Sequence, residues 1–228
     1  MSSVDITVVA YAEQAARLVA ERLAETARSG GHICLTGGST PKRAYELAAR
    51  LEPDWGGAAL WWGDERCVPP DDERSNYGMA REALLDKLET PPRAVHRMEG
   101  ELGGAAAAEA YERELHGVRF DLLLLGIGPD AHVASLFPDA PTLAERGRLA
   151  TVAEPYFEPI VERVSLTLPA LCSATAIVFL AAGPSKAGAV RRAFASTPSR
   201  AAPASLVRSD SGPTRAVLDE AAASGLSR

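Results

Sequence analysis

An aspartate and a histidine stand two residues apart, directly after a strongly apolar segment of the chain. The run Phe120–Leu125 is followed by Gly126-Ile-Gly-Pro-Asp-Ala-His132. Such an apolar run is typical of a buried strand in an α/β protein, and these folds place their chemistry at the carboxyl ends of strands. Residues two apart in extended chain point the same way. We therefore predict that Asp130 orients the imidazole of His132, which acts as a base.

A second candidate site is the turn Thr36-Gly-Gly-Ser-Thr-Pro41, which lies between a predicted strand and a predicted helix. Glycine lets the backbone approach a ligand, and a helix N-terminus presents free N–H groups to an anion. Gly38, Ser39 and Thr40 are therefore candidates for anion binding, with an ordinary capped turn as the alternative. The turn is neither a Walker A loop nor GxGxxG.

Charged residues elsewhere could complete an anion site. Asp64 and Arg66 follow the predicted strand that ends at Trp62, and a guanidinium there could bind a phosphate through two hydrogen bonds. A solvated ion-pair loop is the alternative. Arg163 lies in a predicted strand, and Lys186 stands at the start of a predicted helix, where a cation does not help the helix dipole. That placement favours an anion bound by both Lys186 and the helix N-terminus, and a solvent-facing lysine is the alternative.

Strand and helix patterns alternate along the chain and indicate the fold. We predict strands at 6–11, 32–36, 58–62, 120–125, 161–168 and 175–181, and helices at 12–29, 41–51, 76–88, 104–116 and 184–195. We expect a polar loop at 63–75, a surface loop at 196–213, and a solvated face at Arg191-Arg192. The alternation predicts one α/β domain over residues 1–228, with a mostly parallel sheet and helices on both faces.

Composition narrows the classes of function. The chain has 228 residues and a net charge of −6, so it does not attract nucleic acid or an anionic membrane, and an anionic ligand needs a local basic pocket. Cys34, Cys67 and Cys172 are far apart, which predicts no disulfide framework and a cytoplasmic location. We find no signal peptide and no apolar run approaching the ~20 residues of a membrane span. Zinc-ligand spacing, a GxSxG elbow and a nicotinamide fingerprint are also missing.

Several short motifs occur in order between residues 35 and 206: Leu35-Thr-Gly-Gly-Ser-Thr-Pro41, Trp62-Gly-Asp-Glu-Arg66, Ser75-Asn76-Tyr77, Leu125-Gly-Ile-Gly-Pro-Asp-Ala-His132, Ala134-Ser-Leu-Phe-Pro138, Arg163-Val-Ser-Leu-Thr167, Gly183-Pro-Ser-Lys186 and Pro203-Ala-Ser-Leu206. Each motif alone is weak. As an ordered set they resemble the 6-phosphogluconolactonases of the pentose phosphate pathway.

The resemblance implies a hydrolase that opens 6-phosphoglucono-1,5-lactone without a metal or an organic cofactor. The implied fold is the Rossmann-like sheet shared with glucosamine-6-phosphate deaminases and ribose-5-phosphate isomerases. His132 corresponds to the family's base and Asp130 to its neighbouring carboxylate. Cationic positions around the phosphate and sugar correspond to Arg66, Arg163 and Lys186, and the turn that holds the ligand corresponds to Gly38, Ser39 and Thr40. We expect a phosphorylated sugar lactone as the partner, and a monomer or at most a weak homodimer.

One position departs from the family, which usually has glycine between the aspartate and the histidine where this chain has Ala131. A positive φ at that residue would strain the loop by about 1 kcal/mol, whereas a negative φ would be harmless.

Three other functions stay open. The first is a sugar-phosphate deaminase or isomerase on the same fold, but deaminases with this loop carry a glutamate five residues after the histidine, where this chain has Phe137. The second is a non-catalytic sugar-phosphate-binding protein, which would tend to lose the base that this chain retains. The third is a carboxylesterase, for which no activated serine or cysteine can be named.

Overall fold

A computed structural model describes residues 3–154 and 160–226 of the chain. The strands are β1 (Val4–Val9), β2 (His32–Leu35), β3 (Ala59–Trp62), β4 (Asp64–Arg66), β5 (Ala94–Val95), β6 (Leu122–Leu125), β7 (Ala150–Ala153), β8 (Arg163–Leu166), β9 (Ile177–Ala181) and β10 (Thr214–Asp219). The helices are α1 (Ala12–Arg28), α2 (Ser39–Leu51), α3 (Asn76–Ala83), α4 (Gly104–Leu115), α5 (Leu168–Cys172), α6 (Ala187–Ala193) and α7 (Glu220–Ala223). Short 3-10 turns include Leu85–Lys87, Pro184–Lys186 and Pro203–Leu206.

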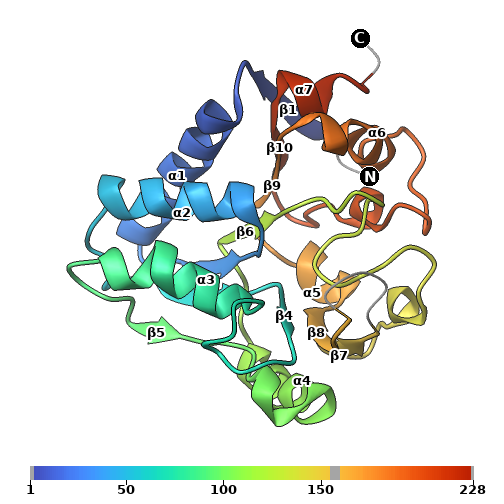
Figure 1. The fold of residues 1–228 in the computed structure, drawn as a ribbon. Helices are drawn as coiled ribbons and strands as arrows, with labels where there is room; N and C mark the ends of the chain where they lie inside the picture. The colour runs from blue at the N-terminus through green and yellow to red at the C-terminus, as the bar shows by residue number, and fades with distance from the viewer. Residues whose placement is uncertain (1–2, 155–159, 227–228) are drawn as a thin grey trace.

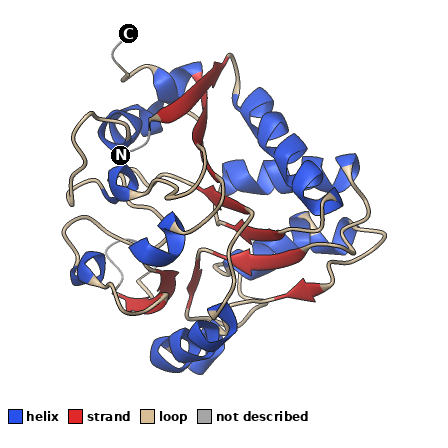
Figure 2. Ribbon diagram, turned by 180° about the vertical axis from the view of Figure 1, so that it is seen from behind, coloured by secondary structure: helices blue, strands red, loops and turns tan. Residues whose placement is uncertain are grey.

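A seven-stranded sheet forms the centre of the fold, in the order β1-β10-β9-β6-β2-β3-β5. Each neighbouring pair of strands is parallel. Figure 2 shows these strands between helices on either side. The predicted mostly parallel sheet is therefore confirmed. The direction in which successive strands are added to the sheet reverses at β2, because β3 lies on one side of β2 and β6 lies on the other.

The central strands are apolar throughout because both faces of the sheet are covered. Leu122 and Leu124 of β6 pack with side chains of α1, α2 and α3, whereas Leu123 and Leu125 pack with side chains of α4, α5, α6 and α7. Figure 1 shows α1, α2 and α3 on one side of the strands and α5 and α6 on the other. This explains the uninterrupted apolar run in β6. Within the described ranges, no helix is both long and apolar enough to cross a membrane.

The prediction of a loop at 63–75 is wrong at its start, because β4 occupies 64–66. This strand pairs antiparallel with β8, and β8 pairs antiparallel with β7, in a separate three-stranded sheet. A strand of three charged residues carries no hydrophobic alternation, so its sequence gave no sign of it. Leu166 N–H donates to Gly63 O (2.9 Å), which joins this small sheet to the end of β3.

The segment 196–213, predicted as a surface loop, is partly buried. Most of its 3-10 turn at Pro203–Leu206 is buried, and Val207 is fully buried. The buried guanidinium of Arg208 donates to the carbonyls of Ala193 (3.0 Å), Ala204 (3.1 Å) and Val207 (2.7 Å). Since buried backbone groups need hydrogen-bond partners, these bonds allow part of a segment without regular secondary structure to be buried. The next strand, β10, was not predicted, and neither were β5 and β7.

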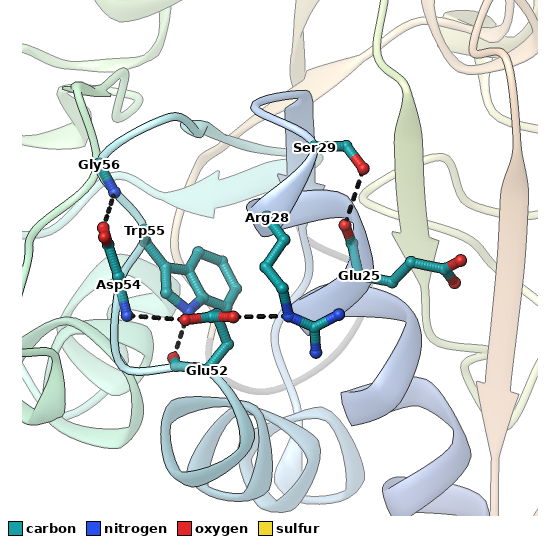
Figure 3. Close-up of polar contacts among 7 residues, drawn as sticks. All are labelled: Glu25, Arg28, Ser29, Glu52, Asp54, Trp55 and Gly56. Carbon is teal, nitrogen blue, oxygen red and sulfur yellow. Dashed lines mark hydrogen bonds and ion pairs between the residues drawn. The ribbon is translucent and has the colours of Figure 1, made fainter.

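Polar contacts at the end of α2 fix the turn that leads from this helix to β3 (Figure 3). Arg28 at the end of α1 forms an ion pair with Glu52, with Nε 2.6 Å from Oε2. Trp55 Nε1 donates to the carbonyl of Glu52 (2.8 Å), and Gly56 N–H donates to Asp54 Oδ1 (2.9 Å). The C-terminal end of α2 is thereby linked to the C-terminal end of α1.

His32, at the start of β2, links this strand to β3 through its ring. Trp61 Nε1 donates to Nδ1 of His32 (3.0 Å), and Nη2 of Arg93 lies 3.2 Å from Nε2. Protonation would place N–H groups on both ring nitrogens, each facing another donor. Burial lowers the pKa of His32, the charge of Arg93 adds to this effect, and Asp121 opposes it.

We expect acid to weaken the fold through His32. Its pKa is lower in the folded chain than the ordinary value of 6.5, so the unfolded chain binds the proton more readily. This stabilisation is present above the ordinary value and is lost as the pH falls through the lower, folded value. In urea unfolding between about pH 5 and pH 8, His32→Gln should show a flatter pH dependence of the free energy of unfolding than wild type. Parallel curves for the two proteins would contradict this expectation.

Candidate active site

A cavity of about 260 Å³ opens at the carboxyl ends of β2, β3, β6 and β9. The loops after β2 and β6 meet there because these strands are neighbours, and the strand order reverses beside them. Open α/β sheets bind their ligands at such a switch point. The cavity is lined by every predicted site residue except Asp130, namely Gly38, Ser39, Thr40, Asp64, Arg66, His132, Arg163 and Lys186.

Asp130 lies beside His132 and contacts it twice. Oδ1 of Asp130 accepts from the backbone N–H of His132 (3.1 Å) and lies 2.5 Å from Nδ1 of the ring. Desolvation raises the pKa of Asp130, but the hydrogen bonds and charge of His132 outweigh it and hold that pKa below its ordinary value. A carboxylate at Nδ1 fixes the ring's tautomer and orientation, so that Nε2 is the nitrogen that can accept a proton.

The predicted reason for this pairing was wrong, because the segment is a turn and not extended chain. Ala131 has φ of +69°, and its N–H donates to Gly128 O (2.9 Å). The aspartate is therefore brought to the histidine by a turn that its own carboxylate closes. Alanine in this conformation adds about 1 kcal/mol of strain compared with glycine. A hydrogen bond from Ala204 N–H to Ala131 O (3.0 Å) helps to hold the strained residue in place.

The N-terminus of α2 forms the opposite wall of the cavity and has no side-chain cap. Its N-cap residue is Gly38, with φ of +112°, and Ser39 and Thr40 follow in the first turn. First-turn N–H groups have no partner within the helix, so they and the helix dipole favour an anion. Tyr45 secures the turn, since its hydroxyl accepts from Thr36 N–H (2.9 Å) and donates to Thr36 O (2.7 Å).

Two arginines stand directly opposite each other across the small sheet, Arg66 on β4 and Arg163 on β8. Arg163 is only 5% exposed, and burial lowers its pKa, while the charge of Asp64 acts in the other direction. Like charges that face each other across strands are destabilising. A bound phosphate would relieve that repulsion and accept hydrogen bonds from both guanidinium groups.

Two cations that follow β9 hold the loop that carries His132. Nζ of Lys186, which lines the cavity, donates to Ile127 O (2.7 Å), and burial lowers the pKa of this amine. Nη2 of Arg192 on α6 donates to Pro129 O (3.0 Å). Arg192 was predicted to lie on a solvated face. It is exposed, but it also supports the loop that carries His132, a long-range contact that its local sequence does not indicate.

Asp64 is held by two residues that were not predicted as site residues. Its Oδ2 accepts from Ser135 Oγ (2.6 Å), and Asn76 Nδ2 donates to its Oδ1 (3.3 Å) and to its carbonyl (2.9 Å). Asn76 also lines the cavity, and a Cβ atom on Gly37 would overlap its Oδ1. The motif Ser75-Asn76-Tyr77 was noted in the sequence, but nothing local indicated a role. Among the described residues, no cluster of histidine, cysteine and carboxylate side chains is arranged to hold a metal ion.

Comparison with known proteins agrees with this geometry. Residues 7–216 match the family described as glucosamine-6-phosphate isomerases/6-phosphogluconolactonase. A 6-phosphogluconolactonase of Streptomyces coelicolor is 40% identical, over 94% of this chain and 89% of that protein. The structure of 6-phosphogluconolactonase from Trypanosoma brucei superposes with a TM-score of 0.88 at 28% identity and covers all of both chains. A monomeric glucosamine-6-phosphate deaminase superposes with a TM-score of 0.86 at 21% identity, over 97% of this chain and all of that chain, a likeness of fold.

The fold and the cavity thus define an α/β protein with a candidate ligand site at the switch point of a parallel sheet. The match over most of the chain makes it a member of the glucosamine-6-phosphate isomerase/6-phosphogluconolactonase family.

Gly128, in the loop that carries His132, lies close against the imidazole, which gives a test of the site. A Cβ atom at this residue would overlap the imidazole of His132, so in Gly128→Ala the ring or the loop must shift and the contact with Asp130 is disturbed. We expect turnover of the substrate proposed below to fall by about 100-fold, because such a displacement disrupts the reacting geometry. Gly188→Ala on α6 is the matched control, since a Cβ there meets nothing within 4 Å. Equal activity of the two variants would show that the position of the ring is unimportant.

Proposed function

We propose that this protein hydrolyses 6-phosphoglucono-1,5-lactone to 6-phosphogluconate, as the names of its relatives indicate. The observation that carries the proposal is the joining, in one cavity, of the Asp130–His132 pair with the uncapped N-terminus of α2 and three cationic side chains. The cations suit a phosphate, and the imidazole suits activation of water. This combination matches a phosphorylated ester that water opens.

In the proposed reaction, His132 takes a proton from water as the water oxygen bonds to C1 of the lactone. Asp130 stabilises the imidazolium that forms. The bond between C1 and the ring oxygen then breaks, and the imidazolium gives its proton to that oxygen, which becomes a hydroxyl group. The new carboxylic acid releases a proton to solvent. A δ-lactone is an activated ester, so a positioned water, a base and nearby positive charge are sufficient.

The remaining site residues bind the substrate in this proposal. Arg66 and Arg163 hold the phosphate with the N–H groups and hydroxyls at Ser39 and Thr40, and Lys186 contributes a third positive charge to the cavity. Gly38 allows the backbone at the start of α2 to approach the ligand. Asp64 balances the charge of Arg163 and can orient a sugar hydroxyl. Support comes from the common cavity that these side chains line.

One specific observation favours the lactonase over a deaminase. Phe137 is buried and its ring packs against that of His132, with 4.9 Å between the ring centroids. A deaminase needs an acid for ring opening, and the position where the resembling deaminases carry glutamate is here an apolar side chain. A non-catalytic binding protein is the third possibility, and it would bind sugar phosphate without turnover.

We also propose that the chain is a monomer, or at most a weak homodimer, in the cytoplasm. All but one of the predicted site residues line the same cavity within this chain, so the proposed chemistry can be carried by residues of a single subunit. The three cysteines are unpaired, as in proteins of a reducing compartment. Light scattering coupled to size exclusion should give the mass of one chain, 24.0 kDa, at micromolar concentration. A stable mass of twice that value would contradict the proposal.

Hydrolysis of freshly generated 6-phosphoglucono-1,5-lactone is the decisive measurement, coupled to 6-phosphogluconate dehydrogenase and corrected for spontaneous opening. We expect wild-type activity and a loss of about 10²- to 10⁴-fold in His132→Asn, since the variant lacks the base. Asp130→Asn should also lose activity, because Nδ1 then lacks its carboxylate. His32→Gln is the matched control and should keep full activity, as His32 does not line the cavity.

Each other outcome has a clear meaning. Full activity in His132→Asn would exclude that residue as the base while leaving the lactonase assignment intact. No rate above background in the wild type would exclude the lactonase. Release of ammonia from glucosamine 6-phosphate would then support the deaminase, and ligand binding without turnover would support the binding protein.

A further inference from the structure

Phe137 lies between the histidine of the site and one of its arginines. Its ring centroid is 4.9 Å from that of His132 and 5.6 Å from Cζ of Arg163. The side chain is 1% exposed. We propose that Phe137 is a positioning residue that holds the His132 imidazole and the Arg163 guanidinium at a fixed separation, with its aromatic ring in contact with both. This inference rests on the proposed function, because it concerns the cation that forms on His132 during hydrolysis.

The ring's chemistry suits that position. When His132 accepts a proton from water, two positive charges face Phe137, and Arg163 is buried, so water screens their repulsion poorly. The face of an aromatic ring attracts cations, and its volume keeps the two groups apart. An aliphatic side chain would fill part of the space without the attraction. A carboxylate there would pair with Arg163 and form a second acid–base group beside the histidine.

The backbone holds Phe137 where this role requires it. Val133 and Leu136 form an antiparallel bridge that closes the turn before it, and Ala140 N–H donates to Phe137 O (3.2 Å). Ser135 N–H donates to Ser165 Oγ (3.1 Å), and Ser165 lies on β8 two residues after Arg163. The loop and the arginine are therefore fixed to the same strand.

Other charges near His132 also favour or oppose the cation. Asp130 lies on the same loop as His132. The segments after β9 contribute Lys186 and Arg192, and β8 contributes Arg163. From β4 come Arg66 and Asp64. Asp130 Oδ1, 2.5 Å from Nδ1 of His132, is the carboxylate in direct contact with that cation, and the ring of Phe137 contacts the same imidazole.

Replacement of Phe137 by leucine tests the proposal against a role in core packing alone. We expect Phe137→Leu to lower kcat by about 10-fold, because the imidazole and guanidinium lose their fixed spacing. The acid limb of the kcat/KM profile should move to lower pH by about half a unit, because the protonated histidine loses its aromatic contact. Phe137→Tyr keeps the ring and should keep the wild-type profile. Phe137→Met provides a second non-aromatic variant if the leucine variant does not fold.

Phe179→Leu is the matched control. Phe179 on β9 is also fully buried and packs against another aromatic ring, Phe194, at 5.6 Å between centroids. Its replacement should lower the thermal unfolding midpoint as Phe137→Leu does, yet leave the pH profile unchanged. If both leucine variants keep the wild-type profile and differ only in stability, Phe137 is a core residue and the inference is wrong.

A measurement without turnover separates this inference from the proposed function. The ring protons of His132 can be followed by NMR through a pH titration in the wild type, Phe137→Leu and Phe179→Leu. We expect the His132 titration to move to lower pH only in Phe137→Leu. That shift in a protein without lactonase activity would overturn the proposed function and keep the positioning role. Unchanged titration in an active lactonase would overturn the positioning role alone.

Discussion

The parallel pairing of β2 with β6 is the constraint on which the candidate site depends. Ile33 pairs with Leu122 and Cys34 with Leu123, and all four side chains are buried. A shift of one residue would exchange the side chains between the two cores, so burial on both faces fixes the register. Since both strands end at the same edge, the uncapped start of α2 and the loop with His132 must meet. Hydrophobic packing thus fixes where the polar groups converge.

The N-termini of α2 and α3 differ in whether a side chain of the protein binds their backbone N–H groups. At α3, the carboxylate of Glu65 accepts from the backbone N–H groups of Asn76 (2.7 Å) and Tyr77 (2.7 Å), and from Ser75 Oγ (3.0 Å). The protein itself supplies the anion that this helix end favours. At α2, no side chain caps the first turn. Only α2, of these two helices, leaves its N-terminal N–H groups for a ligand, and the small sheet that carries Glu65 also carries Arg66 toward that ligand.

The sequence indicated the parts of the fold in which local pattern and burial agree. The apolar runs of β2, β3, β6 and β9 and the periodic helices α1, α2 and α4 were recognisable, so the motifs at their ends were placed correctly. Contacts over long range determined the rest. β4 is a strand because β8 pairs with it. The segment 196–213 is partly buried, and Arg208 satisfies two of its carbonyls. Arg192 reaches the loop that carries His132 from α6. The single domain over 1–228 and the roles of the site residues stay predictions.

The charges that line the cavity affect both substrate binding and product release in the proposed reaction. The chain carries −6 overall, whereas Arg66, Arg163 and Lys186 face the cavity with Asp64 as the carboxylate among its lining residues. An acidic protein with a local basic pocket admits a small phosphorylated molecule and repels extended polyanions. Hydrolysis adds a carboxylate to the ligand, so the same cations attract the product more strongly than the lactone. In the proposed mechanism the new carboxylate forms beside His132, whose Nδ1 lies 2.5 Å from Oδ1 of Asp130. The negative charge of Asp130 would then oppose that gain, so the aspartate proposed to orient the base would also favour departure of the product.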